Sequence, residues 1–298
     1  MMKNPDQQMD AILITGPTAS GKSALALSLA RQYDGVVINA DSMQVYGVLR
    51  VLTARPSQDE MDGVPHHLYG HVDPRRSYST GEWLREISSL LAELKAQRRM
   101  PVIVGGTGLY FKALTGGLSD MPEIPAEIRE HWRSRLLAEG ATDLHAILAE
   151  RDPDIAARLA VEDGQRIIRA LEVLEATGQS ISAFQGKAGP VVVDPLKARK
   201  IVVLPERSLL HDRINRRFAK MLDEGAVEEV EALLALNLAP EMPAMKAIGV
   251  SQIAAMLQGS LSKAEVIALS SAATRQYAKR QMTWFRNQMD ETWERVVP

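Results

Sequence analysis

The chain has 298 residues, of which 46% are hydrophobic and 24% charged, and this composition is typical of a globular protein. The formal net charge of −2 argues against a protein that coats nucleic acid through bulk positive charge. The absence of cysteine excludes disulfides and thiolate metal sites. Together with an N-terminal segment that lacks a long apolar run, it leads us to expect a cytoplasmic protein, not inserted in a membrane and most simply a monomer.

Four continuous apolar runs predict buried β-strands. They are AILIT at 11–15, VVINAD at 36–41, PVIVGG at 101–106 and KIVVLP at 200–205. Helical patterns separate them, including SALALSLARQY after the first run and residues 79–98 before the third. Such alternation is typical of a parallel sheet covered on both faces, so the sequence predicts an α/β core.

The stretch between the third and fourth runs has no comparable β-pattern. It contains amphipathic patterns such as EIREHWRSRLLAEG and DGQRIIRALEVLEATG, bounded by Gly- and Pro-rich segments. We therefore expect a helical insertion at 117–198. The core would then comprise 1–116 and 199–298, with helices after the fourth strand.

Residues 16–23, GPTASGKS, match the phosphate-loop pattern G-x-x-x-x-G-K-[ST] between a predicted strand and a predicted helix. The glycines permit a tight backbone path, and the loop amides and helix N-terminus attract anionic oxygens. Lys22 adds a cation, and the Ser23 hydroxyl can ligate Mg²⁺. The pattern predicts a diphosphate or triphosphate site made of Gly16, Pro17, Thr18, Ala19, Ser20, Gly21, Lys22 and Ser23.

Asp41, at the end of the second predicted strand, has two interpretations. In a kinase or ATPase, an aspartate at this place helps to position magnesium. The residues that follow Asp41, among them Ser42, Gln44 and Tyr46, are better suited to hydrogen bonding and stacking with a flat polar group. No adenine-binding lid or protein-kinase catalytic loop is recognisable.

The order and spacing of many short segments resemble one family, the bacterial tRNA dimethylallyltransferases, or isopentenyl-diphosphate:tRNA isopentenyltransferases. The segments are GPTASGKS, ADSMQVY, TARP, PHHL, DP followed by YS, PVIVGGTGLYFKAL, QRIIRALEV, RRFAKML, AIG and TRQYAKRQMTWFR. The resemblance extends over nearly the whole chain. The sequence departs from the commoner family pattern at Gly47 and Val250.

The resemblance implies a P-loop NTPase-like core and a prenyl transfer. A dimethylallyl group would move from dimethylallyl diphosphate to the exocyclic N6 amine of adenosine-37 in tRNAs that read codons starting with U, with release of diphosphate. The phosphate loop, which by pattern alone indicates ATP or another nucleotide, would then hold the diphosphate of the donor. Mg²⁺ on Ser23 is the implied cofactor.

The resemblance also assigns roles to three residues. Asp41 would accept a hydrogen bond and then the proton from the adenine amine. Arg217 would stabilise the negative charge on the departing diphosphate, and Thr107 would contact the target base or the donor. Without the resemblance, the favoured interpretation of Arg217 is an arginine on a solvated helix face. Thr107 could also serve as a helix N-cap.

The tRNA contacts that the resemblance implies are spread over the chain, and the insertion would bind the anticodon stem-loop. They are Asp41, Ser42, Met43, Gln44, Thr107, Arg129, Gln165, Arg166, Ile167, Ile168, Arg169, Arg275, Lys279 and Arg280. In the C-terminal segment we expect Trp284 and Phe285 to be core residues. The target adenine must leave its stack to react, and arginines with aromatic side chains suit such splayed bases.

Two other functions remain open. The first is an isopentenyltransferase that acts on free adenine nucleotides, which would not require the helical insertion. The second is a P-loop small-molecule kinase, in which Asp41 would serve magnesium.

Overall fold

The computed structural model describes residues 9–186 and 189–298, which form two compact units. The helical unit spans Gly116–Pro190, and the core unit contains the described residues on either side of it. The predicted insertion ended later, at 198. Residues after Pro190 belong instead to the core unit, where the amides of Val192 and Val193 donate to the Leu114 carbonyl oxygen at 3.1 and 3.0 Å.

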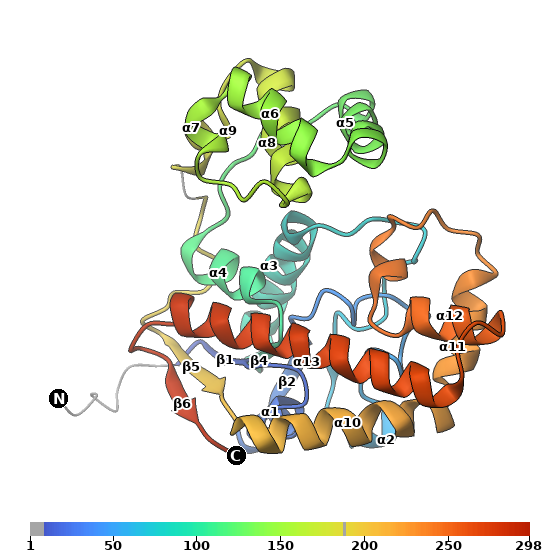
Figure 1. Ribbon diagram of the computed structural model, residues 1–298. Coiled ribbons are helices and arrows are strands. Elements are labelled where there is room, and N and C mark those ends of the chain that lie inside the picture. Colours follow the sequence, from blue (N-terminus) through green and yellow to red (C-terminus); the bar gives the residue numbers. More distant parts are fainter. Residues whose placement is uncertain (1–8, 187–188) are drawn as a thin grey trace. The chain divides into compact units, whose positions relative to one another are not determined.

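In the described part of the chain, a six-stranded parallel sheet with the order β3-β2-β4-β1-β5-β6 forms the centre of the core unit (Figure 1). Its strands are β1 Ala11–Thr15, β2 Gly35–Asn39, β3 His66–His67, β4 Met100–Gly105, β5 Ala198–Val203 and β6 Glu294–Val296. The four predicted runs correspond to β1, β2, β4 and β5, which confirms the parallel α/β core. The short edge strands β3 and β6 were not predicted, because they carry no apolar run.

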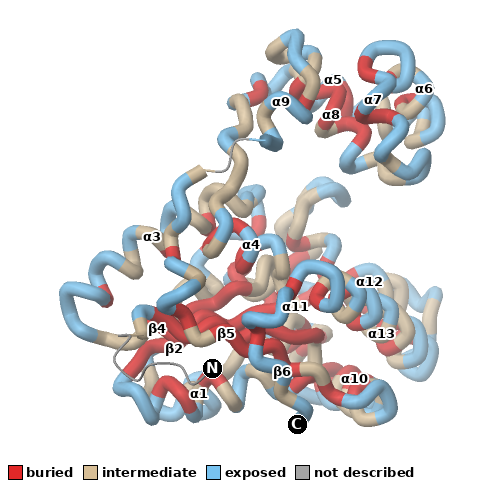
Figure 2. Tube along the Cα trace, turned by 90° about the vertical axis from the view of Figure 1, so that its left-hand side faces the viewer, coloured by how far each residue is buried: buried red, intermediate tan, exposed pale blue. Residues whose placement is uncertain are grey.

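Both faces of the sheet are buried, which explains the continuous apolar runs. Along β1, Leu13 packs in a cluster with Trp83, whereas Ile12 and Ile14 pack in a second cluster with Leu29 of helix α1 (Lys22–Gln32). Figure 2 shows the resulting band of buried residues through β2, β4 and β5. A strand covered on both faces has no solvent-facing row that would favour polar side chains.

Helices of the core unit cover the sheet and extend beside it. They are α1 Lys22–Gln32, α2 Gln58–Met61, α3 Thr80–Ala96, α4 Gly108–Gly116, α10 Arg207–Asp223, α11 Ala226–Leu234, α12 Val250–Leu257 and α13 Lys263–Gln288, with a 3₁₀ turn, η1, at Pro243–Lys246. The long helix α13 runs beside α10 (Figure 1). A cluster that includes Phe218, Leu233 and Ile253 packs on Val45 and Leu49, and so anchors the loop that follows β2.

The helical unit has its own hydrophobic core. Its helices are α5 Ala126–Glu139, α6 Ala141–Arg151, α7 Pro153–Ala156, α8 Gly164–Thr177 and α9 Ile181–Gln185. Trp132 is only 1% exposed and donates from Nε1 to Glu175 Oε2 at 3.0 Å. Leu144 of α6 and Leu171 of α8 complete the centre of this core at 0% exposure.

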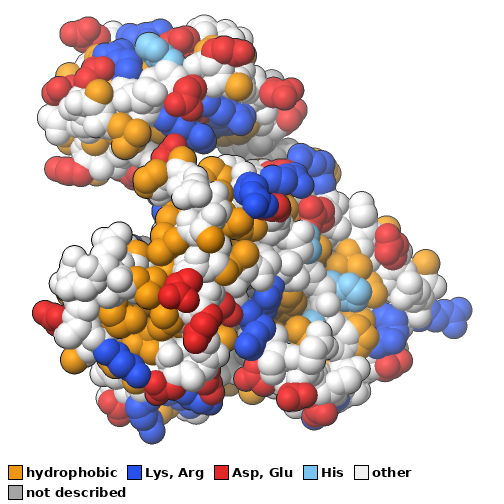
Figure 3. Space-filling view, turned by 90° about the vertical axis from the view of Figure 1, so that its right-hand side faces the viewer, with side chains coloured by type: hydrophobic (Ala, Val, Ile, Leu, Met, Phe, Trp, Pro, Cys, Tyr) orange, Lys and Arg blue, Asp and Glu red, His pale blue; other side chains and the backbone are white. Residues whose placement is uncertain are grey.

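The surface carries charges of both signs. Figure 3 shows acidic and basic side chains interspersed over the visible face of each unit, as the net charge of −2 leads one to expect. Any attraction for a polyanion must therefore come from local groups. Within residues 9–186 and 189–298, no helix combines the length and apolar character needed to cross a membrane.

Candidate active site

Three neighbouring strands of the sheet lead into the loops that carry the predicted site residues. The strands β2, β4 and β1 are adjacent and parallel, so their carboxyl ends meet at one edge of the sheet. There β1 runs into the phosphate loop, β2 ends two residues before Asp41, and β4 ends two residues before Thr107. The topology thus brings together residues that are far apart in sequence.

The phosphate loop, residues 16–23, has the backbone geometry of an anion site. Gly21 has a φ of 89°, in the left-handed region that favours glycine, and it caps α1 without a side chain. The N–H groups of the first turn, which begins at Lys22, therefore lack a side-chain cap and remain available to an anion. At Gly16, a Cβ would lie 2.6 Å from the Val203 carbonyl oxygen, so this position must be glycine.

Lys22 supplies the cation of the loop. Its Nζ donates to the Pro17 carbonyl oxygen at 3.2 Å. Burial lowers the pKa of Lys22 from 10.5 to about 8, the attraction of Asp41 opposes this shift, and the repulsion of Arg217 adds to it. A bound anion would favour the charged ammonium and raise this pKa again.

Helix α10 adds four cations at helical spacing along one side. Arg213 donates to the Ser20 carbonyl oxygen at 3.3 Å, and Arg217 donates to Thr18 Oγ1 at 3.0 Å. Arg216 and Lys220 lie on the same side of the helix but are exposed. Burial lowers the pKa of Arg217, and Asp41 opposes that shift. Arg217, which the resemblance places at the departing diphosphate, is thus bonded directly to the phosphate loop.

These groups surround a cavity of about 560 Å³. It is lined by Thr18, Ala19, Ser20, Gly21, Lys22, Ser23, Asp41, Gln44, Thr53, Ala54, Arg213, Arg216, Arg217 and Lys220. Five of these residues are cationic and Asp41 is the one acidic residue among them. Such a site favours a multivalent anion held close to a carboxylate.

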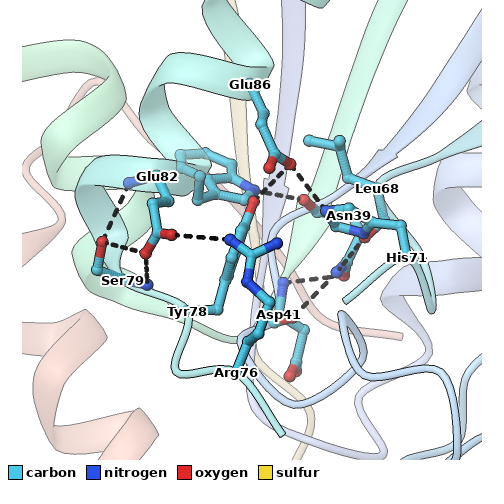
Figure 4. Close-up of polar contacts among 10 residues, drawn as sticks. Asn39, Asp41, Leu68, His71, Arg76, Tyr78, Ser79, Glu82 and Glu86 are labelled. Carbon is cyan, nitrogen blue, oxygen red and sulfur yellow. Dashed lines mark hydrogen bonds and ion pairs between the residues drawn. The ribbon is translucent and has the colours of Figure 1, made fainter. Parts of the chain in front are cut away.

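Asp41 is held by a network at the end of β2 (Figure 4). Asn39 accepts the Asp41 N–H at 2.9 Å and donates to the carbonyl oxygens of Asp41 and Leu68, each at 3.0 Å. Asn39 is itself held by Trp83, whose Nε1 donates to its carbonyl oxygen at 2.9 Å. On the side chain, Oδ1 of Asp41 accepts the Met43 N–H at 2.9 Å, so the carboxylate has a fixed direction.

Thr107 is bonded to the segment that carries Asp41. Its Oγ1 accepts the Ser42 N–H at 2.9 Å and donates to Ser42 Oγ at 3.2 Å. Its own N–H donates to the Ala40 carbonyl oxygen at 3.2 Å. A Cβ on Gly105 would lie 1.9 Å from that carbonyl oxygen, which explains the glycine before this turn.

Gln281 of α13 belongs to this site, and the sequence reasoning missed it. Its Oε1 accepts the Thr18 N–H at 2.9 Å and its Nε2 donates to the Gly106 carbonyl oxygen at 3.0 Å. The signal that could have found it is helical spacing, because Gln281 shares the buried side of α13 with Ala278 and Phe285. A glutamine on a buried helix face needs partners.

Of the other predicted tRNA contacts in the core unit, Ser42 and Met43 are half-buried beside Asp41. Gln44 lines the cavity, but its amide already donates to the carbonyl oxygens of Thr53 and Ala54 at 2.9 and 3.0 Å. These bonds shape the wall of the cavity.

In α13, Phe285 is a core residue as predicted, with 2% exposure, whereas Trp284 is only partly buried. Arg275 donates to Asn215 of α10 at 2.5 Å. The exposed Lys279 and Arg280 line a second cavity of about 510 Å³. Arg275 is thus engaged with α10, whereas Lys279 and Arg280 face the second cavity.

In the helical unit, the predicted contacts fall into two kinds. Arg129 on α5 and Gln165 and Arg166 at the start of α8 are exposed, and Arg166 lies 3.4 Å from Asp163. Arg169 is half-buried and pairs with Glu172 at 3.3 Å. All of these side chains can reach solvent.

Ile167 and Ile168, the other predicted contacts on α8, have buried side chains. They are 0% and 4% exposed and pack in the core of the helical unit. The resemblance implied tRNA contacts for every residue from Gln165 to Arg169, whereas helix α8 directs the side chains of these two residues into the core.

The residues around Ser23 fit Mg²⁺. Ser23 and Asp41 line the same cavity and offer the oxygen ligands that this ion prefers. In the described ranges, no group of three or more His, Cys, Asp or Glu residues could form an all-protein metal cage. The site therefore suits an ion that takes its remaining ligands from phosphate and water, as Mg²⁺ commonly does.

Comparisons with known proteins find relatives over the whole length of this chain. The sequence pattern of the IPP transferase family matches residues 44–288, and that of the isopentenyl transferases matches residues 9–73. A tRNA dimethylallyltransferase of Allorhizobium ampelinum is 72% identical over 298 residues, covering 100% of this chain and 98% of the relative. The enzyme of the same name from Agrobacterium fabrum is 70% identical over 100% of both chains.

Two solved structures share the fold. A tRNA isopentenylpyrophosphate transferase from Bacillus halodurans has a TM-score of 0.67 at 34% identity, over 96% of this chain and 89% of its own. A eukaryotic dimethylallyltransferase acting on tRNA has a TM-score of 0.81 at 26% identity, over 96% and 73%. Both have the P-loop NTPase-like fold that the sequence predicted.

Proposed function

This chain belongs to the IPP transferase family, and on that premise we propose that it transfers a dimethylallyl group from dimethylallyl diphosphate to tRNA. The acceptor is the exocyclic N6 amine of adenosine-37, in tRNAs that read codons starting with U. The product is N6-dimethylallyladenosine and the leaving group is diphosphate.

One observation carries this proposal. The phosphate loop, the cations of α10 and the carboxylate of Asp41 line a single cavity. A kinase would need the carboxylate for magnesium alone. Here Asp41 is also fixed beside Thr107 through Ser42, on a segment that can hold a flat base.

The reaction requires one bond to form and one to break. The adenine N6 attacks C1 of the prenyl group, and the C1–O bond to diphosphate breaks as the N6–C1 bond forms. Asp41 accepts the proton that N6 loses. Lys22, Arg217 and the loop amides stabilise the charge that develops on the departing oxygen.

A magnesium ion fits this scheme at Ser23, with Asp41 nearby. When bound, the ion would neutralise part of the diphosphate charge and so make it a better leaving group. The chain's own residues orient the donor: Arg217 holds Thr18, and Arg213 holds the Ser20 carbonyl at the turn of the loop.

Binding of the anticodon stem-loop is proposed for the helical unit together with the exposed cations of α13. Arg129, Gln165 and Arg166 offer polar contacts in the helical unit, and Lys279 and Arg280 offer them in the core unit. The adenine must leave its stack to reach Asp41. We further propose that the enzyme works as a cytoplasmic monomer, in keeping with a chain that has no cysteine.

The test is a transfer assay with labelled dimethylallyl diphosphate and Mg²⁺, offering unmodified tRNA, AMP or no acceptor. We expect label in tRNA alone, at the adenosine beside the anticodon. Label in AMP but not in tRNA would identify an enzyme of free nucleotides. Turnover of ATP without RNA would identify a kinase.

A further inference from the structure

Gln281 is bonded both to the phosphate loop and to the turn that follows β4. The side chain is 7% exposed on α13. Because Oε1 faces an N–H and Nε2 faces a carbonyl oxygen, the orientation of the amide is fixed. An inverted amide would place its NH₂ group against the Thr18 N–H and its oxygen against the Gly106 carbonyl oxygen, so both hydrogen bonds would be lost.

The two partners of Gln281 belong to different functions. Thr18 is part of the phosphate loop and is also held by Arg217. Gly106 precedes Thr107, which is bonded to Ser42 beside Asp41. The side chain of Gln281 thus links the phosphate loop, proposed to bind the prenyl donor, to the turn of Thr107, proposed to lie beside the target adenine.

The turn after β4 is shaped to receive this side chain. A Cβ on Gly106 would lie 2.4 Å from Gln281 Nε2 and 3.3 Å from Asp41 Oδ2. One turn further along α13, Trp284 covers Gly108, where a Cβ would lie 2.3 Å from the indole ring. The two glycines let α13 lie directly on the turn.

We propose that Gln281 is a positioning residue, which holds the phosphate loop and the turn of Thr107 at the separation that the transfer needs. This inference rests on the proposed function. Attack requires the reacting atoms to be about 3 to 3.5 Å apart, and small displacements are costly. Gln281 touches neither reacting atom, so its loss should lower kcat more than the affinity for the donor.

Two substitutions test this role. Gln281→Met keeps the size of the side chain but removes both hydrogen bonds, and kcat should fall by about 10- to 100-fold at every pH. Gln281→Glu can accept the Thr18 N–H, but it can donate to the Gly106 carbonyl only when protonated. Burial raises the pKa of a carboxyl group, so acid should restore the second bond.

The measured quantity is the ratio of kcat for Gln281→Glu to kcat for Gln281→Met between pH 8 and pH 5.5. Since the two variants differ only at residue 281, the ratio reports the protonation of that side chain. We expect it to rise at least about fivefold as the pH falls. Gln258→Glu, an exposed control at the end of α12, should follow the wild-type profile.

A flat ratio would overturn the proposal, as would a Gln281→Met variant with wild-type kcat. A variant that loses affinity for inorganic diphosphate while its kcat is unchanged would also overturn it. If Gln281→Met fails to fold, the profile of Gln281→Glu divided by that of the wild type gives the same test.

Hydrogen exchange separates this proposal from the proposed function. In the ligand-free protein the Thr18 N–H is bonded to Gln281, so Gln281→Met should speed its exchange by about tenfold or more. This readout does not depend on any activity. Unchanged exchange at Thr18 would show that the bond does not hold the loop.

Discussion

Removing the charge of Lys22 should stabilise the ligand-free protein while it destroys binding of diphosphate. A pKa lowered from 10.5 to about 8 means that the folded state disfavours the charged ammonium. At 1.36 kcal/mol per pH unit this amounts to about 3 kcal/mol, an upper figure because the side chain is only half-buried. The lost bond to Pro17 offsets about 1 kcal/mol, so Lys22→Met should stabilise by about 2 kcal/mol at pH 7.

The effect has a defined pH window. Below about pH 8, Lys22 is protonated in both the folded and the unfolded state, and the full penalty remains. Between about 8 and 10.5 only the unfolded state keeps the proton, so the wild type gains stability as the pH rises. The advantage of Lys22→Met should therefore shrink from pH 8 upward.

Urea unfolding followed by tryptophan fluorescence measures this difference. Trp83, Trp284 and Trp293 lie in the core unit, whereas Trp132 lies in the helical unit. A Trp132→Phe background confines the signal to the core unit.

The control is Lys112→Met, an exposed lysine on α4, which should change stability by less than about 0.5 kcal/mol at any pH. A Lys22→Met protein that is less stable than the wild type at pH 7 would refute the reasoning. A stability gain that does not change with pH would refute the assigned cause.

Two other substitutions test the site, and a third tests the stability of the loop that follows β2. Asp41→Ala should slow transfer by about 100-fold or more and leave the Kd for tRNA within a few-fold; a loss of donor binding with unchanged catalysis would show another role. Arg217→Lys should lower kcat about tenfold or more in single-turnover assays, because lysine cannot keep the guanidinium geometry; an unchanged rate contradicts its role at the leaving group. Glu229→Gln should lower the free energy of unfolding by about 1 to 3 kcal/mol in urea titrations, because Glu229 accepts the N–H groups of Val51 and Leu52 at 2.7 and 3.0 Å.

The sequence predicted those parts of the molecule that depend on local pattern. Strands buried on both faces are uniformly apolar, and the phosphate loop depends on a short motif with fixed backbone demands. Asp41 and Thr107 lie at one edge of the sheet because parallel strands all end on the same side. The predicted parallel core is therefore confirmed, because all four predicted strands belong to one parallel sheet.

Other features depend on tertiary contacts that no local pattern reveals. The bridge by Gln281 joins residues 263 and 175 positions away in sequence. Ile167 and Ile168 were predicted as contacts together with their polar neighbours on the same segment. On α8, however, their side chains face the hydrophobic core, whereas those of Gln165 and Arg166 face solvent. The edge strands β3 and β6 form because neighbouring strands offer free hydrogen-bonding groups.

The return of the chain at Leu114 makes the insertion modular. Two amides on the incoming segment, those of Val192 and Val193, bind the carbonyl of the residue just before the chain departs. The helical unit therefore leaves and rejoins the core unit at neighbouring points, so its length need not affect the sheet. Replacing residues 116–190 with another module would leave the phosphate loop, Asp41 and Thr107 in place, because all of them belong to the core unit.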